Sequence, residues 1–234
     1  MDPFSSETQR IVAAYERRKR TVPPDRYSVF NPGNTLDSQE LEREILALLD
    51  RENFDPSGEK LILEVGCGTG VWLREFVKWG ALPDHLVGID LLSERIEKAR
   101  NLCPRGIRLE CGNAARLAFP NDFFDLVLQS TVFTSILDRS LRHAVAAEML
   151  RVLKPNGFII WYDFHWNNPR NHDVRGIRGR EIRELFSGCQ VRLHRVTLAP
   201  PIGRVVGRYS SLLYILLSRT KILCTHYLAL IRKN

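Results

Sequence analysis

Apolar residues along the chain follow two different rhythms. Short, mostly aliphatic runs predict buried strands at 61–65, 86–89, 107–111, 122–129 and 158–162. Between these runs, apolar positions recur every three or four residues, which predicts helices with one buried face. The middle of the chain therefore alternates strands with helices, as is typical of an α/β domain.

Two further helices are predicted before the first strand. The segment Ser6–Gln9 has the spacing of a capping box and opens a helix that extends to about Arg20. Two prolines end that helix, and an irregular loop leads to a second helix at about 38–51. We expect residues 1–54 to form a helical cap on a domain formed by residues 55–234.

The tail of the chain adds a short helix at 180–186 and strands at 191–198 and 225–231, which can pair as an antiparallel edge. About 26 residues separate these two strands, so a helical insertion is expected at about 200–224. We predict a single helix from about Arg204 to Ser218 within it. Its apolar stripe consists of Val205, Tyr209, Leu212, Leu213 and Leu216.

Length and composition favour one large domain with a well-buried core, since the chain has 234 residues of which 44% are hydrophobic and 26% are charged. The five cysteines are an odd number without a C-x-x-C pair, and no signal segment precedes them. They are therefore predicted to be free thiols of a cytoplasmic protein. No apolar run approaches the roughly 20 residues that a membrane-spanning helix needs.

The net charge of +7 is concentrated in the last third of the chain. Residues 166–234 contain thirteen lysines and arginines and three acids, whereas residues 1–165 carry a net charge of −3. Such a bias is typical of contact with an anionic partner, and it also fits a surface that is simply basic and solvated.

The strand at 61–65 runs directly into three glycines at alternate positions, Gly66, Gly68 and Gly70. Turns of this kind let the backbone approach a ligand closely. Dinucleotide folds use G-x-G-x-x-G spacing, but here the third glycine comes one residue early. Glu64 would repel a pyrophosphate yet could accept a hydrogen bond from an ammonium group, so this turn suits a ligand with a cationic end.

The segment Leu63–Gly70 resembles the first motif of the class I S-adenosylmethionine-dependent methyltransferases. Similar motifs continue over about residues 60–163, and the segment Glu148–Gly157 resembles the branch of that class that acts on small molecules. The resemblance implies a three-layer, doubly wound α/β fold with a seven-stranded, mostly parallel sheet whose last strand is antiparallel. It also implies S-adenosyl-L-methionine as cofactor and methyltransferase activity.

Asp90 follows the second strand, where an acid of a doubly wound sheet lies beside the glycine turn and can accept both ribose hydroxyls. The alternative is that Asp90 caps the next helix, although Ser93 is better placed for that role. The resembled class usually has an acid near Asn113, and the amide there is a weaker acceptor for an adenine amino group. The predicted cofactor-binding residues are Glu64, Gly66, Cys67, Gly68, Gly70, Asp90, Leu91, Asn113, Ala114 and Gln129.

A polar segment at 163–173 leaves the fifth strand at its carboxyl end, where ligands bind in open α/β sheets. Three interpretations stay open. His165 or His172 could be the general base that removes a proton from an acceptor hydroxyl. Asp163, Asn167 and Asp173 could bind Mg²⁺, although no metal site is predicted. The segment could also be a polar loop without a catalytic residue.

The function that we predict is methyl transfer to a small or medium-sized metabolite, at oxygen, such as a natural product, a sugar or glycan, or a quinone-like acceptor. Residues 129–133 contain neither the Asp/Asn-Pro-Pro-aromatic motif of adenine-type DNA enzymes nor a Pro-Cys nucleophile, so DNA is not expected as a partner. An RNA methyltransferase would explain the basic tail, but the chain has no spare length for an RNA-binding domain. A cofactor-binding protein without activity would explain Asn113.

Two segments are predicted to border the cleft. The N-terminal segment covers the cofactor cleft in the resembled class, and Tyr15 or Tyr27 could serve there. The insertion at about 200–224 joins its apolar stripe to a rim of four cations, so it is either a lid with buried apolar side chains or a surface that rests on anionic lipid. The rim consists of Arg204, Arg208, Arg219 and Lys221. No oligomeric state is predicted.

Overall fold

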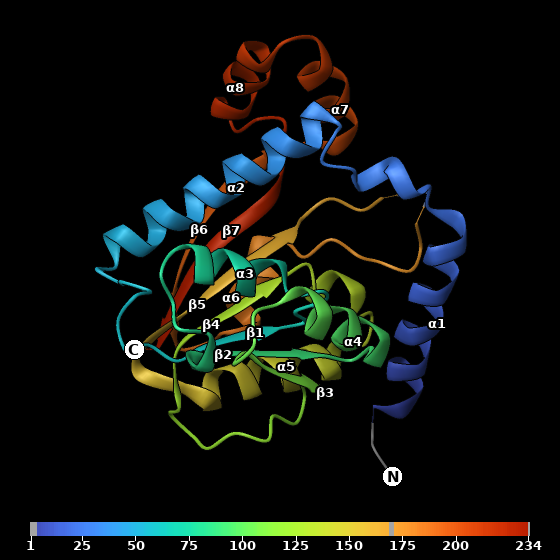
Figure 1. Ribbon diagram of the computed structural model, residues 1–234. Helices are drawn as coiled ribbons and strands as arrows, with labels where there is room; N and C mark the ends of the chain where they lie inside the picture. Colours follow the sequence, from blue (N-terminus) through green and yellow to red (C-terminus); the bar gives the residue numbers. More distant parts are fainter. Residues whose placement is uncertain (1–3, 169–170, 234) are drawn as a thin grey trace.

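A computed structural model describes residues 4–168 and 171–233 and has a seven-stranded sheet at its centre (Figure 1). The strand order is β3-β2-β1-β4-β5-β7-β6, with β7 antiparallel to both of its neighbours and β1 to β5 parallel. This confirms the predicted fold class. The strands are β1 (Ile62–Val65), β2 (Leu86–Asp90), β3 (Arg108–Cys111), β4 (Phe124–Ser130), β5 (Leu153–Phe164), β6 (Cys189–Leu198) and β7 (Cys224–Lys233).

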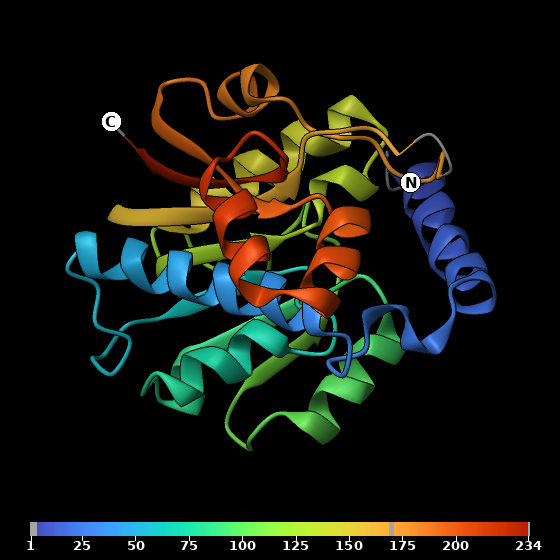
Figure 2. The same ribbon diagram turned by 90° about the horizontal axis from the view of Figure 1, so that it is seen from above.

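Helices cover both faces of the sheet, as seen from above in Figure 2. Side chains alternate along each strand, so Leu63 faces the helices on one side of the sheet while Ile62 faces those on the other. The helices are α1 (Ser5–Thr21), α2 (Pro32–Arg51), α3 (Val71–Lys78), α4 (Ser93–Leu102), α5 (Arg139–Val152), α6 (Gly179–Leu185), α7 (Pro200–Tyr209) and α8 (Ser211–Arg219). Short 3₁₀ turns are η1 (Pro24–Tyr27), η2 (Pro83–His85) and η3 (Phe133–Ser135).

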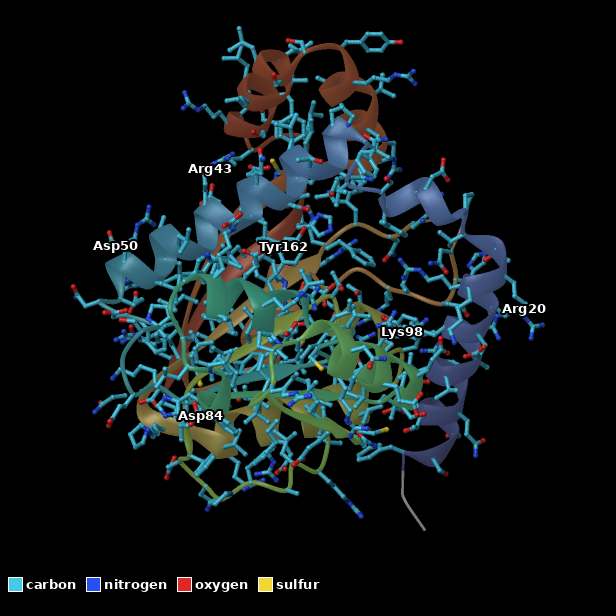
Figure 3. The ribbon with its side chains drawn as sticks, in the orientation of Figure 1. Arg20, Arg43, Asp50, Asp84, Lys98 and Tyr162 are labelled. Atoms are coloured by element: carbon cyan, nitrogen blue, oxygen red, sulfur yellow. The ribbon has the colours of Figure 1, made fainter. Side chains whose placement is uncertain are left out.

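The two halves of the core have different helices. The helices α5 and α6 bury their apolar side chains on one face of the sheet, whereas α2, α3 and α4 do so on the other. Tyr162 of β5 lies beneath α2, and its hydroxyl group bonds to Thr197 Oγ1 at 2.9 Å (Figure 3). The helix α2 is therefore a layer of the core. Of the predicted N-terminal cap, α1 is the helix that stands apart from the sheet.

Three details of the prediction differ from the structure. The helix α2 begins at Pro32, inside the expected loop, because Asn31 accepts a hydrogen bond from Gly33 N and caps it. The residues expected as a turn at 154–157 belong to β5, which pairs with β4 through a register shift. The predicted single helix of the insertion is two helices, because Ser210 breaks it and caps the second by accepting from Leu213 N at 3.1 Å.

The helices α2 and α7 touch through glycines. A Cβ added to Gly33 would lie 2.3 Å from the carbonyl oxygen of Gly203, and one added to Gly207 would lie 2.7 Å from Cα of Gly33. The insertion is therefore fixed to the N-terminal part of the chain by close backbone contact. None of the helices formed by residues 4–168 and 171–233 has both the length and the hydropathy needed to cross a bilayer. The five cysteines form no disulfide, as predicted.

Candidate functional site

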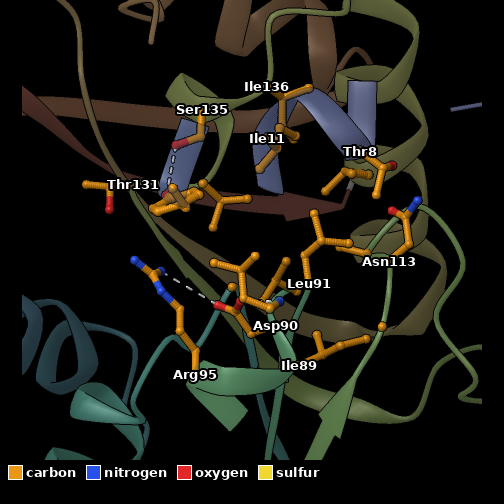
Figure 4. A pocket seen from close by; sticks show the side chains of 18 of the residues that line it. Thr8, Ile11, Ile89, Asp90, Leu91, Arg95, Asn113, Thr131, Ser135 and Ile136 are labelled. Carbon is orange, nitrogen blue, oxygen red and sulfur yellow. Dashed lines mark hydrogen bonds and ion pairs between the residues drawn. The ribbon is translucent and has the colours of Figure 1, made fainter. Parts of the chain in front are cut away.

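A cleft lies at the carboxyl ends of β1, β2, β3 and β4, the edge of the sheet at which open α/β folds bind their ligands. Figure 4 shows Thr8 and Ile11 on one side of it and Asp90 and Leu91 on the other. The residues that line it are Thr8, Ile11, Tyr15, Val65, Gly66, Ile89, Asp90, Leu91, Leu92, Arg95, Gly112, Asn113, Ala114, Ser130, Thr131, Val132, Ser135, Ile136, Leu141 and Val145.

The glycine turn forms the floor of the cleft beside β1. Gly66, Gly68 and Gly70 all have positive φ values, 69°, 55° and 74°, which side chains of L-residues rarely tolerate. A Cβ at Gly66 would also lie 2.3 Å from Cγ2 of Val132, which lines the cleft. Gly66 itself lines the cleft, while Gly68 and Gly70 shape the turn behind it.

Asp90 connects the turn to the helix that follows β2. Its Oδ2 accepts a hydrogen bond from Gly68 N at 2.8 Å, and its Oδ1 accepts one from Leu92 N at 2.9 Å. Each carboxylate oxygen keeps a further lone pair, and the residue lines the cleft although it is nearly buried. Ser93, which we expected to cap α4, makes no capping bond, so Asp90 holds the start of that helix.

Glu64 lies at the end of β1 with 3% of its surface exposed. Its Oε2 atom has no hydrogen-bond partner among the described residues. Burial raises the pKa of the Glu64 carboxyl well above its usual value, and the charge of Asp90 acts in the same direction. Glu64 does not line the cleft, so it is a buried acid with an unused acceptor next to the glycine turn, behind the cleft surface.

The remaining predicted ligands divide into two groups. Leu91, Asn113 and Ala114 line the cleft, and Asn113 Oδ1 accepts from Ala115 N at 3.0 Å. Gln129 and Cys67 do not line it. The buried amide of Gln129 donates to Tyr162 O at 3.3 Å and accepts from Val132 N at 3.1 Å, so it braces the segment after β4.

The helix α1 supplies one wall of the cleft through Thr8, Ile11 and Tyr15. The Tyr15 hydroxyl lies 3.1 Å from Ser135 Oγ, and the guanidinium carbon of Arg95 lies 4.2 Å from the centre of the Tyr15 ring. Tyr27, the other aromatic considered, is 58% exposed and is not in the cleft.

Several lining residues were not identified from the sequence. Arg95 lies 4.0 Å from Asp90 Oδ2, Ser130 is the last residue of β4, and Thr131 follows that strand. The position of Arg95 in the first turn of a helix after Asp90 is the local signal that would have indicated it. Ser135 belongs to a 3₁₀ turn that no hydrophobic rhythm marks.

The insertion does not line the cleft, and its five stripe residues are all exposed. The interpretation of the insertion as a lid with buried apolar side chains is therefore wrong. Its inner side packs on α2, through Gly203 and Gly207 on α7 and through Tyr214 on α8.

Neither predicted histidine base lines the cleft. Half-buried His165 stacks on Tyr227 with ring centres 4.4 Å apart, and its Nε2 lies 3.2 Å from Cys224 O. Burial lowers the pKa of His165. His172 is exposed, two residues after positions 169–170, which lie outside the described part of the chain. The general-base role stays a prediction.

The three oxygen-bearing residues considered for Mg²⁺ have other partners. Asp163 accepts from Thr134 Oγ1 at 2.6 Å, Asn167 from Gly176 N at 2.9 Å, and Asp173 pairs with Arg17 at 2.6 Å. Burial raises the pKa of Asp163 to about 7. The described residues contain no cluster of three or more histidine, cysteine, aspartate or glutamate side chains that could hold a metal ion.

The chain is similar to known proteins in both sequence and fold. Residues 62–157 match the family described as methyltransferase domain. The sterol 24-C-methyltransferase of Neurospora crassa is 30% identical over 129 residues, which make up 52% of this chain and 32% of that protein. The 2-methyl-6-phytyl-1,4-hydroquinone methyltransferase of Synechocystis is 29% identical over 115 residues, or 48% of this chain and 34% of that protein. The matching segments thus span less than half the length of these curated relatives.

Solved structures show the same architecture. The S-adenosylmethionine-dependent methyltransferase of Mesorhizobium loti superposes with a TM-score of 0.56 at 18% identity, over 78% of this chain and 95% of that chain. At this level of identity the likeness concerns the fold alone.

Proposed function

We propose that this chain, which belongs to the class I, Rossmann-like S-adenosylmethionine-dependent methyltransferases, transfers the methyl group of that cofactor to a small or medium-sized acceptor. The observation that carries the proposal is the cleft at the carboxyl edge of the sheet, where the glycine turn, Asp90 and Asn113 meet. The fold places ligands at this edge, and the family and fold imply S-adenosyl-L-methionine as the cofactor.

The residues present fit this cofactor. The unpartnered Oε2 of buried Glu64 suits an ammonium group, and Gly66 leaves space where a side chain would meet Val132. Asp90 would accept the ribose hydroxyls with its free lone pairs. Asn113 would accept from the adenine amino group, with Leu91 and Ile136 as apolar walls.

When bound, S-adenosylmethionine supplies an electrophilic methyl group on a sulfonium that is a good leaving group, so in-line positioning carries much of the reaction. The helix α1 would orient the acceptor and exclude water, since Ile11 and Tyr15 line the cleft opposite β2. Its attachment to η3 through the Tyr15 and Ser135 hydroxyls would hold that wall in place.

Glu64 predicts a proton linkage to cofactor binding. Because its pKa is raised in the free protein, the carboxyl is protonated over a wider pH range than usual, and an ammonium group would favour its ionised form. We expect binding to release protons and cofactor affinity to rise with pH. Calorimetry in two buffers of different ionisation enthalpy measures this release. The variant Glu64→Gln should bind with no such release, and release that persists in it would assign the proton to another group.

The two histidines provide a second test. A histidine that removes the acceptor's proton would, when replaced by glutamine, lower turnover on the order of 10²-fold while cofactor affinity stays unchanged. Because neither His165 nor His172 lines the cleft, we expect both variants to keep turnover within about threefold of the parent. A hundredfold fall in either one would instead establish a base that reaches the acceptor from the 163–173 segment.

We propose oxygen as the atom methylated. A hydroxyl acceptor can lose its proton to water, so methylation of oxygen does not require a general base from the protein. The titratable residues that line the cleft are Tyr15, Asp90 and Arg95, and none of them is an ordinary general base. Carbon is the second candidate, because the matched N. crassa protein is by name a C-methyltransferase. Mass spectrometry and carbon NMR of the product distinguish a methyl ether from a C-methyl group.

A labelled-methyl assay tests the function itself. We expect label to pass from S-adenosylmethionine into a small-molecule extract. Transfer to RNA would favour an RNA methyltransferase, and cofactor binding without transfer to any fraction would favour an inactive cofactor-binding protein.

A further inference from the structure

The helices α7 and α8 expose their large apolar side chains and pack on α2 through other residues. On α7, the side that faces α2 consists of the small residues Gly203 and Gly207, while Val205 and Tyr209 on the opposite side are 59% and 83% exposed. A helix of a water-soluble domain normally buries its large apolar side chains. The helix α7 instead buries its glycines and exposes its large apolar side chains.

The second helix repeats the arrangement. Its buried residues are Tyr214, whose hydroxyl bonds to Asp37 and Glu40, and Ser218. Its outer residues Leu212 and Leu216 are 66% and 54% exposed. The apolar end face is defined as Val205, Tyr209, Leu212, Leu213, Leu216 and Ile222, all exposed. A group of this size exceeds the scattered apolar residues that need no explanation.

The charge around the apolar end face is of one sign. Residues 199–223 contain four cations and no acid. Arg208 and Arg219 are exposed and form no ion pair within residues 4–168 and 171–233. The acids beneath the insertion are engaged, since Lys221 pairs with Glu40 at 3.5 Å and with Glu44 at 3.1 Å.

The position of the insertion links this face to the cleft. It joins the carboxyl end of β6 to the start of antiparallel β7, so it stands at the same edge of the sheet as the cleft. In Figure 1 the helices α7 and α8 project beyond α2 at that end of the molecule.

We propose that the apolar end face docks on the surface of an anionic lipid bilayer. Exposed leucines and a tyrosine would enter the boundary between headgroups and acyl chains, while Arg208 and Arg219 would contact anionic headgroups. Charge complementarity favours lipid over a second copy of the chain, because a symmetric dimer through this face would bring the same unpaired arginines together. If the proposed function also holds, the acceptor reaches the cleft from the bilayer.

Vesicle flotation tests the docking without reference to activity. The full chain is mixed with vesicles of phosphatidylcholine alone or with added phosphatidylglycerol, at about 50 mM and about 500 mM salt. We expect binding to the anionic vesicles at low salt, weakening as salt screens the arginines. In the variant Arg208→Gln/Arg219→Gln, the partition coefficient onto anionic vesicles should fall by roughly tenfold or more. The variant Leu212→Ser/Leu216→Ser should not bind the vesicles.

Matched controls alter exposed residues elsewhere. Leu102→Ser and Arg100→Gln change an exposed leucine and an exposed arginine on α4 and should leave binding unchanged. Circular dichroism confirms that each variant is folded. Absence of binding at low salt overturns the proposal, as does equal loss in the α4 variants. A dimer in solution that dissociates in Leu212→Ser/Leu216→Ser, without vesicle binding, assigns the face to self-association instead.

Discussion

Replacing Asp90 with alanine is expected to weaken S-adenosylmethionine binding by roughly 2 kcal/mol, or about 30-fold in the dissociation constant. The carboxylate would lose charge-assisted hydrogen bonds to the ribose. The variant also leaves Gly68 N and Leu92 N without the acceptor that now joins the glycine turn to α4. Isothermal titration calorimetry with the cofactor and with its demethylated product measures the change.

Two controls separate ribose contact from damage to the turn. In Asp90→Asn one oxygen can still accept from the backbone, so its loss of affinity should be smaller than that of the alanine variant. Asp84 is exposed and precedes β2, at the opposite edge of the sheet (Figure 3). The variant Asp84→Ala removes the same charge and should bind normally. Unchanged affinity in Asp90→Ala would refute the ribose assignment.

Replacing Glu181 with alanine is expected to lower the free energy of unfolding by about 3 kcal/mol. The side chain of Arg142 is fully buried, and its NH1 lies 2.5 Å from Glu181 Oε1. Glu181 also pairs with Arg175 at 2.5 Å, so its removal leaves two guanidinium groups near each other without their carboxylate. Burial and the charge of Arg175 already lower the pKa of Arg142. Urea denaturation followed by circular dichroism measures the loss.

The neighbouring acid on α6 is the matched control. Glu184 pairs with Arg139 and Arg180, both of them largely exposed, so Glu184→Ala should change stability by about 0.5 kcal/mol or less. The double variant Arg142→Met/Glu181→Ala should recover much of the loss, because no buried charge remains without a partner. A similar loss in both single variants would show that the buried arginine is not the cause.

The core and the floor of the cleft could be predicted because their signals are local. The strand β1 is mostly aliphatic and leads directly into Gly66, whose positive φ value favours glycine. Asp90 was identified because it follows a strand directly. The family and the cofactor followed from these few residues, and the comparisons support both.

What could not be predicted depends on contacts between distant segments. The apolar residues of the insertion keep a helical spacing on both sides of Ser210, so their pattern predicts one continuous helix. The chain breaks there because the Ser210 hydroxyl caps α8. Arg142 occupies a buried position on α5 that sequence alone would place in solvent, and only the fold brings Glu181 to it. Gln129 has the right place in the chain for a ligand, yet its amide is consumed by backbone groups on two sides.

Under the proposed function, the attachment of α1 bears on how quickly the product cofactor can leave the cleft. Ile11 and Ala14 are its buried residues, and most of its other anchors are polar, including the ion pair of Arg17 with Asp173 and the bond from Leu137 N to Glu7. Such an element opens at a smaller free energy than the sheet beneath it. The demethylated cofactor would leave when this helix detaches, so detachment of α1 would limit the rate of turnover. The turnover rate of the proposed reaction would then depend on the few surface contacts that hold α1 in place.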